Sequence, residues 1–348
     1  MNTFFFVMLF IFWTMFGSFA SVIIYRLKSW EWWIFGWRSH CKTCERNLSV
    51  IELIPIFSWL FQWGKCKGCS QKIDWIYPLL ELTMWVLFTA VWYFLISPEL
   101  IFEWSLLEIL KLDFFLGVIF LSFIYIFYDI LYLEIPESIL IFLNVLILSF
   151  LWIEILTAWL FDARVVFFEW MNYTNGWEYL IEQFVLAWII IWWLYLIMLA
   201  WLREVYDIAI LISLWLLLIW ANAYFQSWYP SYIFESPLVS GLFWAMALFS
   251  FFFMQIVISG WKWMWGWDLR IAIAMGLLVW IHFAFPAWMI TYLVGSFIGI
   301  WIIIISRYKK WSQTNFSHQI PFWPFLACWY LSVLFFYPQI TQLIEMYF

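Results

Sequence analysis

The sequence predicts an all-α fold: a polytopic integral membrane helix bundle of about ten spans, with one polar loop. Of the 348 residues, 68% are hydrophobic and 11% are charged, roughly half the charged fraction of a soluble domain or less. Several stretches run for about 18 residues or more without Asp, Glu, Lys or Arg, long enough for a membrane-spanning helix. This composition excludes a water-soluble enzyme and a secreted disulfide-rich module. The net charge of −6 argues against nucleic acid as a partner.

The charge-free runs divide the chain into a first transmembrane helix at 1–25, a polar loop at 26–78 and a membrane-embedded bundle at 79–348. The spans expected within this bundle are 79–97, 114–131, 137–160, 183–202, 208–226, 237–259, 269–283, 286–305 and 320–340. The first run has no basic segment before it and no small-residue cleavage site after it. We therefore expect a retained helix rather than a cleavable signal peptide.

The distribution of Lys and Arg predicts the orientation of the bundle. Loops on the cytosolic side of a membrane protein carry an excess of these residues. With ten spans, all of the 16 basic residues except Lys111 and Arg164 fall on one side. We therefore expect the 26–78 loop to face the cytosol and both chain ends to lie outside.

Two C-x-x-C pairs in the polar loop predict a metal site. The cysteines are Cys41, Cys44, Cys66 and Cys69, and 21 residues separate the two pairs. Four thiolates at two tight turns can surround one zinc ion tetrahedrally, in a structural site with no open position for water. The alternatives are two disulfides, which rarely persist in a reducing compartment, or free cysteines with no role. Cys328 lies alone in the last span, and we expect it to be a packed small side chain.

Two aspartates stand at the expected cytosolic ends of membrane spans. Asp129 lies at the end of the third span and Asp268 at the beginning of the eighth, so the topology places both at one membrane face. Carboxylates are costly in lipid, which makes each a functional candidate. If the two meet, they share one proton, and the pair can activate a water and polarise a peptide carbonyl. The alternative is that each merely marks a membrane boundary, as we expect of other helix-end carboxylates such as Glu81.

Several blocks of the chain resemble, in order, the type IV prepilin peptidases, which are membrane aspartic peptidases of the GxGD class. The blocks are Gly17–Leu27 (GSFASVIIYRL), Arg38–Cys44 (RSHCKTC), Leu53–Leu60 (LIPIFSWL), Gly64–Cys69 (GKCKGC), Tyr77–Leu82 (YPLLEL), Asp129 with Pro136, Asp268, and Ile320–Leu326 (IPFWPFL). Together they reach from the first helix to the last expected span.

This resemblance implies that Asp129 and Asp268 are the two catalytic aspartates and that the four loop cysteines hold zinc. It implies a multi-pass protein of the cell's inner (plasma) membrane that removes the leader peptide of prepilin-like proteins at the cytosolic face. Many members of the family also methylate the new N-terminus with S-adenosylmethionine, and the polar loop is associated with that step.

Three features depart from the family pattern. Ser21 stands where the family usually has Asn, and residues 161–235 form an apparent insertion that would add a helical hairpin. Around the second aspartate, Trp265 and Trp267 occupy glycine positions and Arg270 a lysine position; Trp323 replaces a glycine near the end. An alternative function is therefore a non-catalytic membrane scaffold or assembly protein that retains the fold.

The Trp and Gly counts suggest a different origin for these substitutions. The chain has 33 Trp and 12 Gly, although membrane helices are usually rich in glycine. We hypothesise that the gene comes from a lineage that reads UGA as glycine and that UGA was translated here as Trp. The nucleotide sequence tests this: UGA is expected at codons 265, 267 and 323, and UGG at all three would exclude the hypothesis.

Overall fold

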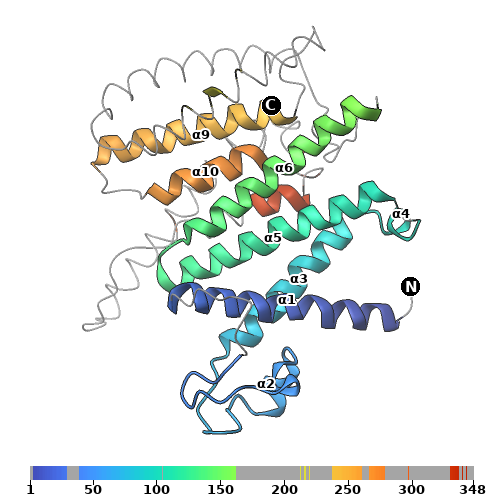
Figure 1. The fold of residues 1–348 in the computed structure, drawn as a ribbon, viewed down its shortest axis with the longest axis vertical. Coiled ribbons are helices and arrows are strands. Elements are labelled where there is room, and N and C mark those ends of the chain that lie inside the picture. Colours follow the sequence, from blue (N-terminus) through green and yellow to red (C-terminus); the bar gives the residue numbers. More distant parts are fainter. Residues whose placement is uncertain are drawn as a thin grey trace. The chain divides into compact units, whose positions relative to one another are not determined.

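The computed structural model describes residues 3–29, 39–103, 105–161, 237–260, 266–278 and 330–336, with a few single positions in the C-terminal half (Figure 1). These described residues are mainly helical, and they contain two isolated β-bridges but no strand. The chain divides into two compact units, Met1–Ile139 and Leu140–Phe348. The predicted helical fold class is confirmed for this part of the chain.

The first unit contains three long helices, α1 (Thr3–Ser29), α3 (Ile76–Phe94) and α5 (Leu106–Tyr132). Within them, Leu9–Ser29, Ile76–Phe94 and Glu108–Tyr132 are long and apolar enough to cross a membrane. These helices coincide with the first three predicted spans. The short helix α4 (Pro98–Phe102) lies between α3 and α5.

α1 contacts both of the other long helices. A Cβ added at Gly17 would lie 2.6 Å from the Cα of Glu81, so only glycine allows α3 to cross α1 this closely. Along α5, the ring of Phe120 contacts Phe16, and Glu134 just beyond the helix pairs with Lys28 at 2.7 Å. α1 and α5 therefore run in the same direction, which agrees with the predicted orientation of the first and third spans.

Residues 39–75 of the polar loop fold into a small module, which lies between α1 and α3 in the chain. It contains a 3-10 helix, η1 (Val50–Leu53), and the five-residue helix α2 (Phe57–Phe61) (Figure 1). After α2, Trp63 donates to the carbonyl of Leu60 at 3.1 Å and Gly64 to that of Trp59 at 2.9 Å. This is a Schellman motif, whose left-handed position is usually glycine. Here Trp63 occupies the left-handed position, with φ of 52°. This conformation fits the hypothesis that some UGA codons, translated here as Trp, encode glycine in the native protein.

The second unit contains most of α6 (Glu137–Phe161), together with α9 (Pro237–Ser259) and α10 (Gly266–Leu278). A Cβ added at Gly276 would lie 2.2 Å from the backbone nitrogen of Ala245, so α9 and α10 are in close backbone contact. Asn144 of α6 donates to the carbonyl of Arg270 at 3.2 Å.

The total number of spans stays a prediction. The spans expected at 183–202, 208–226 and 286–305 and the insertion at 161–235 lie largely outside the described residues, as does most of the span at 320–340. In the described part of the chain, three helices meet the length and apolarity that a membrane crossing needs.

Candidate functional site

The four cysteines of the polar loop lie together in the folded module. The sulfur atoms of Cys41, Cys44, Cys66 and Cys69 are all within 4.8 Å of one another. The Sγ atoms of Cys41 and Cys69 are 3.8 Å apart, far longer than the ~2.05 Å of a disulfide bond. The structure therefore confirms that the two C-x-x-C pairs form one cluster of four free thiols.

The two C-x-x-C pairs adopt the same backbone conformation. In each, the N–H of the first cysteine bonds to the carbonyl five positions later, at 3.0 Å in one turn and 2.9 Å in the other. The residues after the second cysteines, Glu45 and Ser70, have φ of 54° and 57°. Each of the two turns therefore contributes two sulfur atoms to the same cluster.

This cluster fits a tetrahedral zinc ion. A Zn–S bond of about 2.3 Å places neighbouring sulfurs about 3.8 Å apart, as observed for Cys41 and Cys69. The backbone N–H groups of Cys69 and Gly68 lower the pKa of the Cys66 thiol to about 6, so its thiolate is available near neutral pH. The donor set therefore has the ligands and the spacing that zinc requires.

An ion pair between the exposed Arg46 and the buried Glu52 braces the module beside the cluster. Arg46 donates to both carboxylate oxygens of Glu52, at 2.6 and 3.3 Å, and Ser49 donates to Glu52 through its N–H and its hydroxyl, both at 2.9 Å. Arg46 and then the Ser49 backbone lower the pKa of Glu52 from 4.5 to about 2. Because the folded-state pKa is depressed, this stabilisation is complete above the ordinary pKa of 4.5 and is lost as the pH falls toward about 2.

The sequence interpretation missed this bracing pair, although it contains a recognisable signal. Ser49 and Glu52 have the spacing of a capping box, with the serine followed three positions later by a glutamate. The link from Glu52 to Arg46, in the first cysteine turn, has no comparable local pattern.

Glu81 joins the module to the helices, which corrects the expectation that it is a solvated or capping carboxylate. It is buried, and its Oε2 accepts the backbone N–H of Ile56 at 2.6 Å. Its backbone packs against Gly17 of α1, where an added Cβ would lie 2.6 Å from the Cα of Glu81. One residue of α3 thereby contacts both α1 and the segment that leads into α2.

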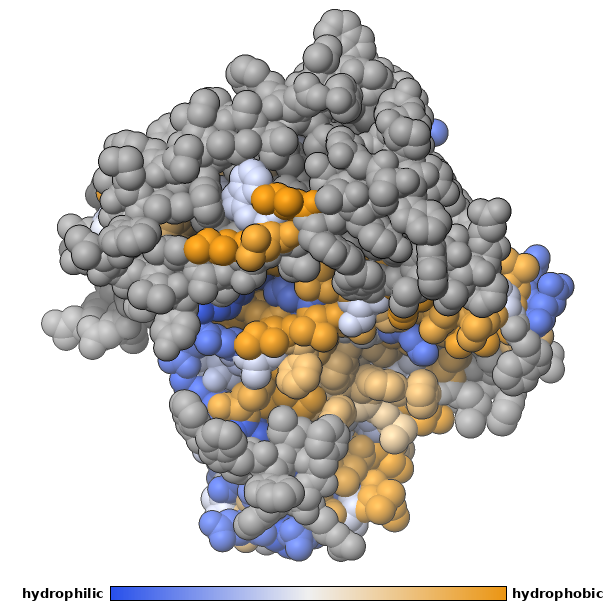
Figure 2. Space-filling model, turned by 45° about the horizontal axis from the view of Figure 1, so that its top comes forward, coloured by the Kyte–Doolittle hydropathy of each residue, from blue (hydrophilic) through white to orange (hydrophobic). Residues whose placement is uncertain are grey.

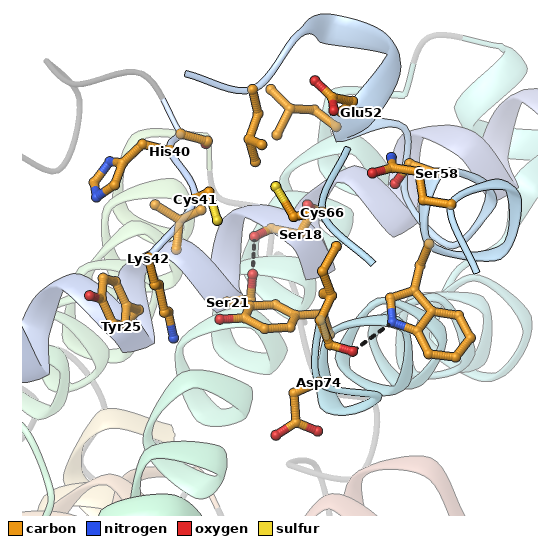
Figure 3. Close-up of a pocket in the computed structure, with 18 of the residues that line it drawn as sticks. Ser18, Ser21, Tyr25, His40, Cys41, Lys42, Glu52, Ser58, Cys66 and Asp74 are labelled. Atoms are coloured by element: carbon orange, nitrogen blue, oxygen red, sulfur yellow. Dashed lines mark hydrogen bonds between the residues drawn. The ribbon is translucent and has the colours of Figure 1, made fainter. Parts of the chain in front are cut away.

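A cavity of about 410 Å³ lies between the module, α1 and the beginning of α3 (Figure 3). Its volume falls in the usual range for small-molecule sites. The wall combines hydroxyl, carboxylate, cationic and aromatic groups, contributed among others by Ser18, Ser21, Tyr25, Arg26, His40, Lys42, Glu52, Trp59, Asp74, Tyr77 and Glu81. Cys41 and Cys66 also line it, so the cavity adjoins the four-cysteine cluster.

Local contacts hold several of the cavity's side chains in place. Ser21 donates to the carbonyl of Ser18 at 2.7 Å, and the Trp59 indole donates to the carbonyl of Ile73 at 3.2 Å (Figure 3). The ammonium of Lys42 lies 3.9 Å from the centre of the Tyr25 ring, at a distance typical of cation–π contacts. The cavity wall is therefore fixed by groups from both the helices and the module.

The two predicted catalytic aspartates are both buried at helix ends. Asp129 lies in the last turn of α5 and is 5% exposed; its Oδ2 accepts no hydrogen bond from the residues that the structure describes. Asp268 lies in the first turn of α10 and is 4% exposed. Asp129 belongs to the first compact unit and Asp268 to the second, so their meeting stays a prediction.

Comparison with known proteins concerns mainly the N-terminal part of the chain. Residues 11–95 match the family described as Bacterial Peptidase A24 N-terminal domain. This segment contains most of α1, the whole four-cysteine module and α3. The match therefore includes both the metal cluster and the cavity beside it.

Curated relatives share the same segment. The chain is 53% identical over 53 residues to a prepilin leader peptidase/N-methyltransferase of Bacillus subtilis, covering 15% of this chain and 21% of the relative. Proteins of the same name from Dichelobacter nodosus and Aeromonas hydrophila are 31% and 32% identical over 130 and 110 residues, covering 28% and 25% of this chain.

The matched segments span 46% of the Dichelobacter nodosus protein and 38% of the Aeromonas hydrophila protein, so the chain spans less than half of these relatives. No solved structure matches the chain significantly. The comparisons confirm the predicted resemblance to type IV prepilin peptidases, and the described four-cysteine module lies within the part of the chain that is similar to them.

Proposed function

We propose that the protein is a membrane aspartic endopeptidase that removes the leader peptide of prepilin-like proteins at the cytosolic face of the inner membrane. The observation that carries this proposal is the match of residues 11–95 to the A24 N-terminal domain, together with relatives named prepilin leader peptidase/N-methyltransferase. The buried carboxylates of Asp129 and Asp268, each at a helix end, support the choice of catalytic residues.

In this proposal Asp129 and Asp268 share one proton and act on one water. The ionised carboxylate takes a proton from the water as its oxygen attacks the scissile carbonyl. The protonated carboxyl donates a hydrogen bond to that carbonyl oxygen and supports the developing charge. Collapse of the tetrahedral intermediate breaks the C–N bond, and the leaving amine receives the proton.

The cavity beside the cysteine cluster is our candidate site for a second reaction, methylation of the new N-terminus. Its volume of about 410 Å³ suits a nucleoside-sized molecule such as S-adenosylmethionine. The wall offers the Trp59 ring for an adenine and the carboxylate of Asp74 for a cationic group. S-adenosylmethionine would supply the methyl group, and the cavity residues would bind and orient it.

In the same proposal a zinc ion bound by the four cysteines has a structural role. It would hold the two cysteine turns together and thereby fix the cavity wall, to which Cys41 and Cys66 contribute.

The alternative function is a non-catalytic membrane scaffold that retains the fold. Trp265 and Trp267, at positions where the family has glycine, favour it, because two indoles cannot reproduce a tight backbone bend beside Asp268. If the native residues are glycines, this argument disappears.

Replacing either aspartate should abolish leader cleavage. Asp129→Asn and Asp268→Asn remove the shared proton but leave the side-chain volume nearly unchanged, so the protein should still insert in the membrane. The measurement is cleavage of a prepilin-like substrate in membranes. Asp113→Asn, an exposed aspartate on the same helix α5, is the matched control and should cleave normally. Normal processing by either active-site variant would refute the pair.

Removing one cysteine from each turn should abolish zinc binding. Cys41→Ser with Cys66→Ser leaves only two sulfurs in the cluster, too few to hold a structural zinc ion. The metal content of the purified protein measures the loss. Cys328→Ser removes the cysteine outside the cluster and should leave the metal content unchanged. Undiminished zinc in the double variant would rule out the site.

Narrowing the cavity should block methylation and spare cleavage. Among the residues that the structure describes, the hydroxyl of Ser21 bonds only to Ser18 of its own helix, so Ser21→Leu fills part of the cavity without breaking a hydrogen bond between these elements. Transfer of a labelled methyl group from S-adenosylmethionine is measured separately from leader cleavage. Ser149→Leu, at an exposed helical serine with a similar backbone bond, serves as the control. Full methylation by Ser21→Leu would contradict the assignment of the cavity.

A further inference from the structure

The module has an exposed apolar edge that no residue described in the structure covers. It consists of Val50 and Ile51 of η1 with Phe57, Leu60 and Phe61 of α2. Val50 is 82% exposed and Phe61 81%, although both are large hydrophobic side chains. A contiguous exposed apolar surface of this kind marks an interaction site.

This apolar edge lies beside the two membrane helices that flank the module. The ring of Phe57 contacts Phe10 of α1, with centroids 6.3 Å apart, and Phe10 contacts Trp85 of α3 at 5.2 Å. Phe10 and Trp85 both belong to segments long and apolar enough to cross a membrane, Leu9–Ser29 and Ile76–Phe94. α2 is therefore attached to the side of α1, within its apolar length.

The backbone around α2 satisfies its own hydrogen bonds. The N–H groups of Ser58 and Leu60 bond to the carbonyls four positions earlier, at 3.0 and 3.1 Å, and the Schellman motif pairs the next donors. The N–H of Ile56, which precedes the helix, bonds to Glu81. A segment in contact with lipid must pair its backbone polar groups in this way, because acyl chains offer no partners.

The module is also amphipathic. Lys42, Lys65, Lys67 and Lys72, around the cysteine turns, are exposed and positively charged, whereas the apolar edge carries no charge. Figure 2 shows apolar surface (orange) continuing from the helical body onto one side of the lower part of the molecule, whose tip is hydrophilic (blue). Such a division of surfaces is typical of a segment seated at a membrane–water boundary.

We propose that the apolar edge is embedded in the lipid bilayer that surrounds α1 and α3, while the cysteine turns stay in water. Continuity favours lipid over a protein partner: the edge adjoins α1, whose own Phe12 and Met15 are 53% and 55% exposed. Embedding the edge removes its large apolar side chains from water and holds the module at a fixed depth. This inference does not depend on the proposed catalytic function.

Site-specific photo-crosslinking tests this proposal. Phe61 is replaced by the photoreactive analogue p-benzoylphenylalanine in the full-length protein, reconstituted in nanodiscs of phosphatidylethanolamine and phosphatidylglycerol. The same probe at Lys67, on the exposed cysteine turn, is the matched control. After irradiation, mass spectrometry quantifies lipid adducts on each labelled peptide, and circular dichroism reports whether each variant is folded. If the Phe61 variant is unfolded, the probe is placed at Leu60 instead.

We expect several-fold more lipid adduct at Phe61 than at Lys67. Equal yields at the two positions would show that the edge faces water and would overturn the proposal. Cross-links from Phe61 to a second copy of the chain would overturn it too, because they would identify the edge as a protein interface. The lipid adduct yields alone decide this proposal, so a loss of leader cleavage in either variant would leave it unchanged and would concern only the proposed peptidase function.

Discussion

The buried carboxylate of Glu81 determines where the cysteine module lies against the membrane helices. It accepts the backbone N–H of Ile56, and the Cα of Glu81 lies against Gly17 of α1. An acid within an apolar helix is costly unless its oxygens are paired, so the helices and the module must meet at this point. The cavity and the position of α2 both follow from this contact.

Two sets of interactions hold the module itself together. The cysteine turns bring four sulfurs to one point, and the pair of Arg46 and Glu52 ties the first turn to η1. A polar loop of this size has little apolar core, so a metal ion would contribute much of its stability. The large apolar side chains of Val50 and Phe61 remain outside that core, which is understandable if lipid covers them.

Local sequence patterns predicted the features that depend on neighbouring residues. The three long helices of the first unit, α1, α3 and α5, lie where the sequence has charge-free runs. The spacing of Cys41, Cys44, Cys66 and Cys69 predicted that these cysteines form a cluster. The contact of Glu81 with Ile56 could not be predicted, because it joins residues 25 positions apart without a periodic pattern. The cavity was missed for the same reason: its wall combines three segments that meet only in the folded chain.

The proposed peptidase chemistry requires that Asp129 and Asp268 meet at one membrane face and share a water. An experimental structure of the full-length protein in lipid nanodiscs tests it most directly, through the separation of the two carboxyl groups. A shared water requires oxygens no more than about 6 Å apart, since each hydrogen bond spans about 3 Å. We expect such a separation; aspartates in opposite leaflets, or too far apart to bond one water, would contradict the proposed mechanism.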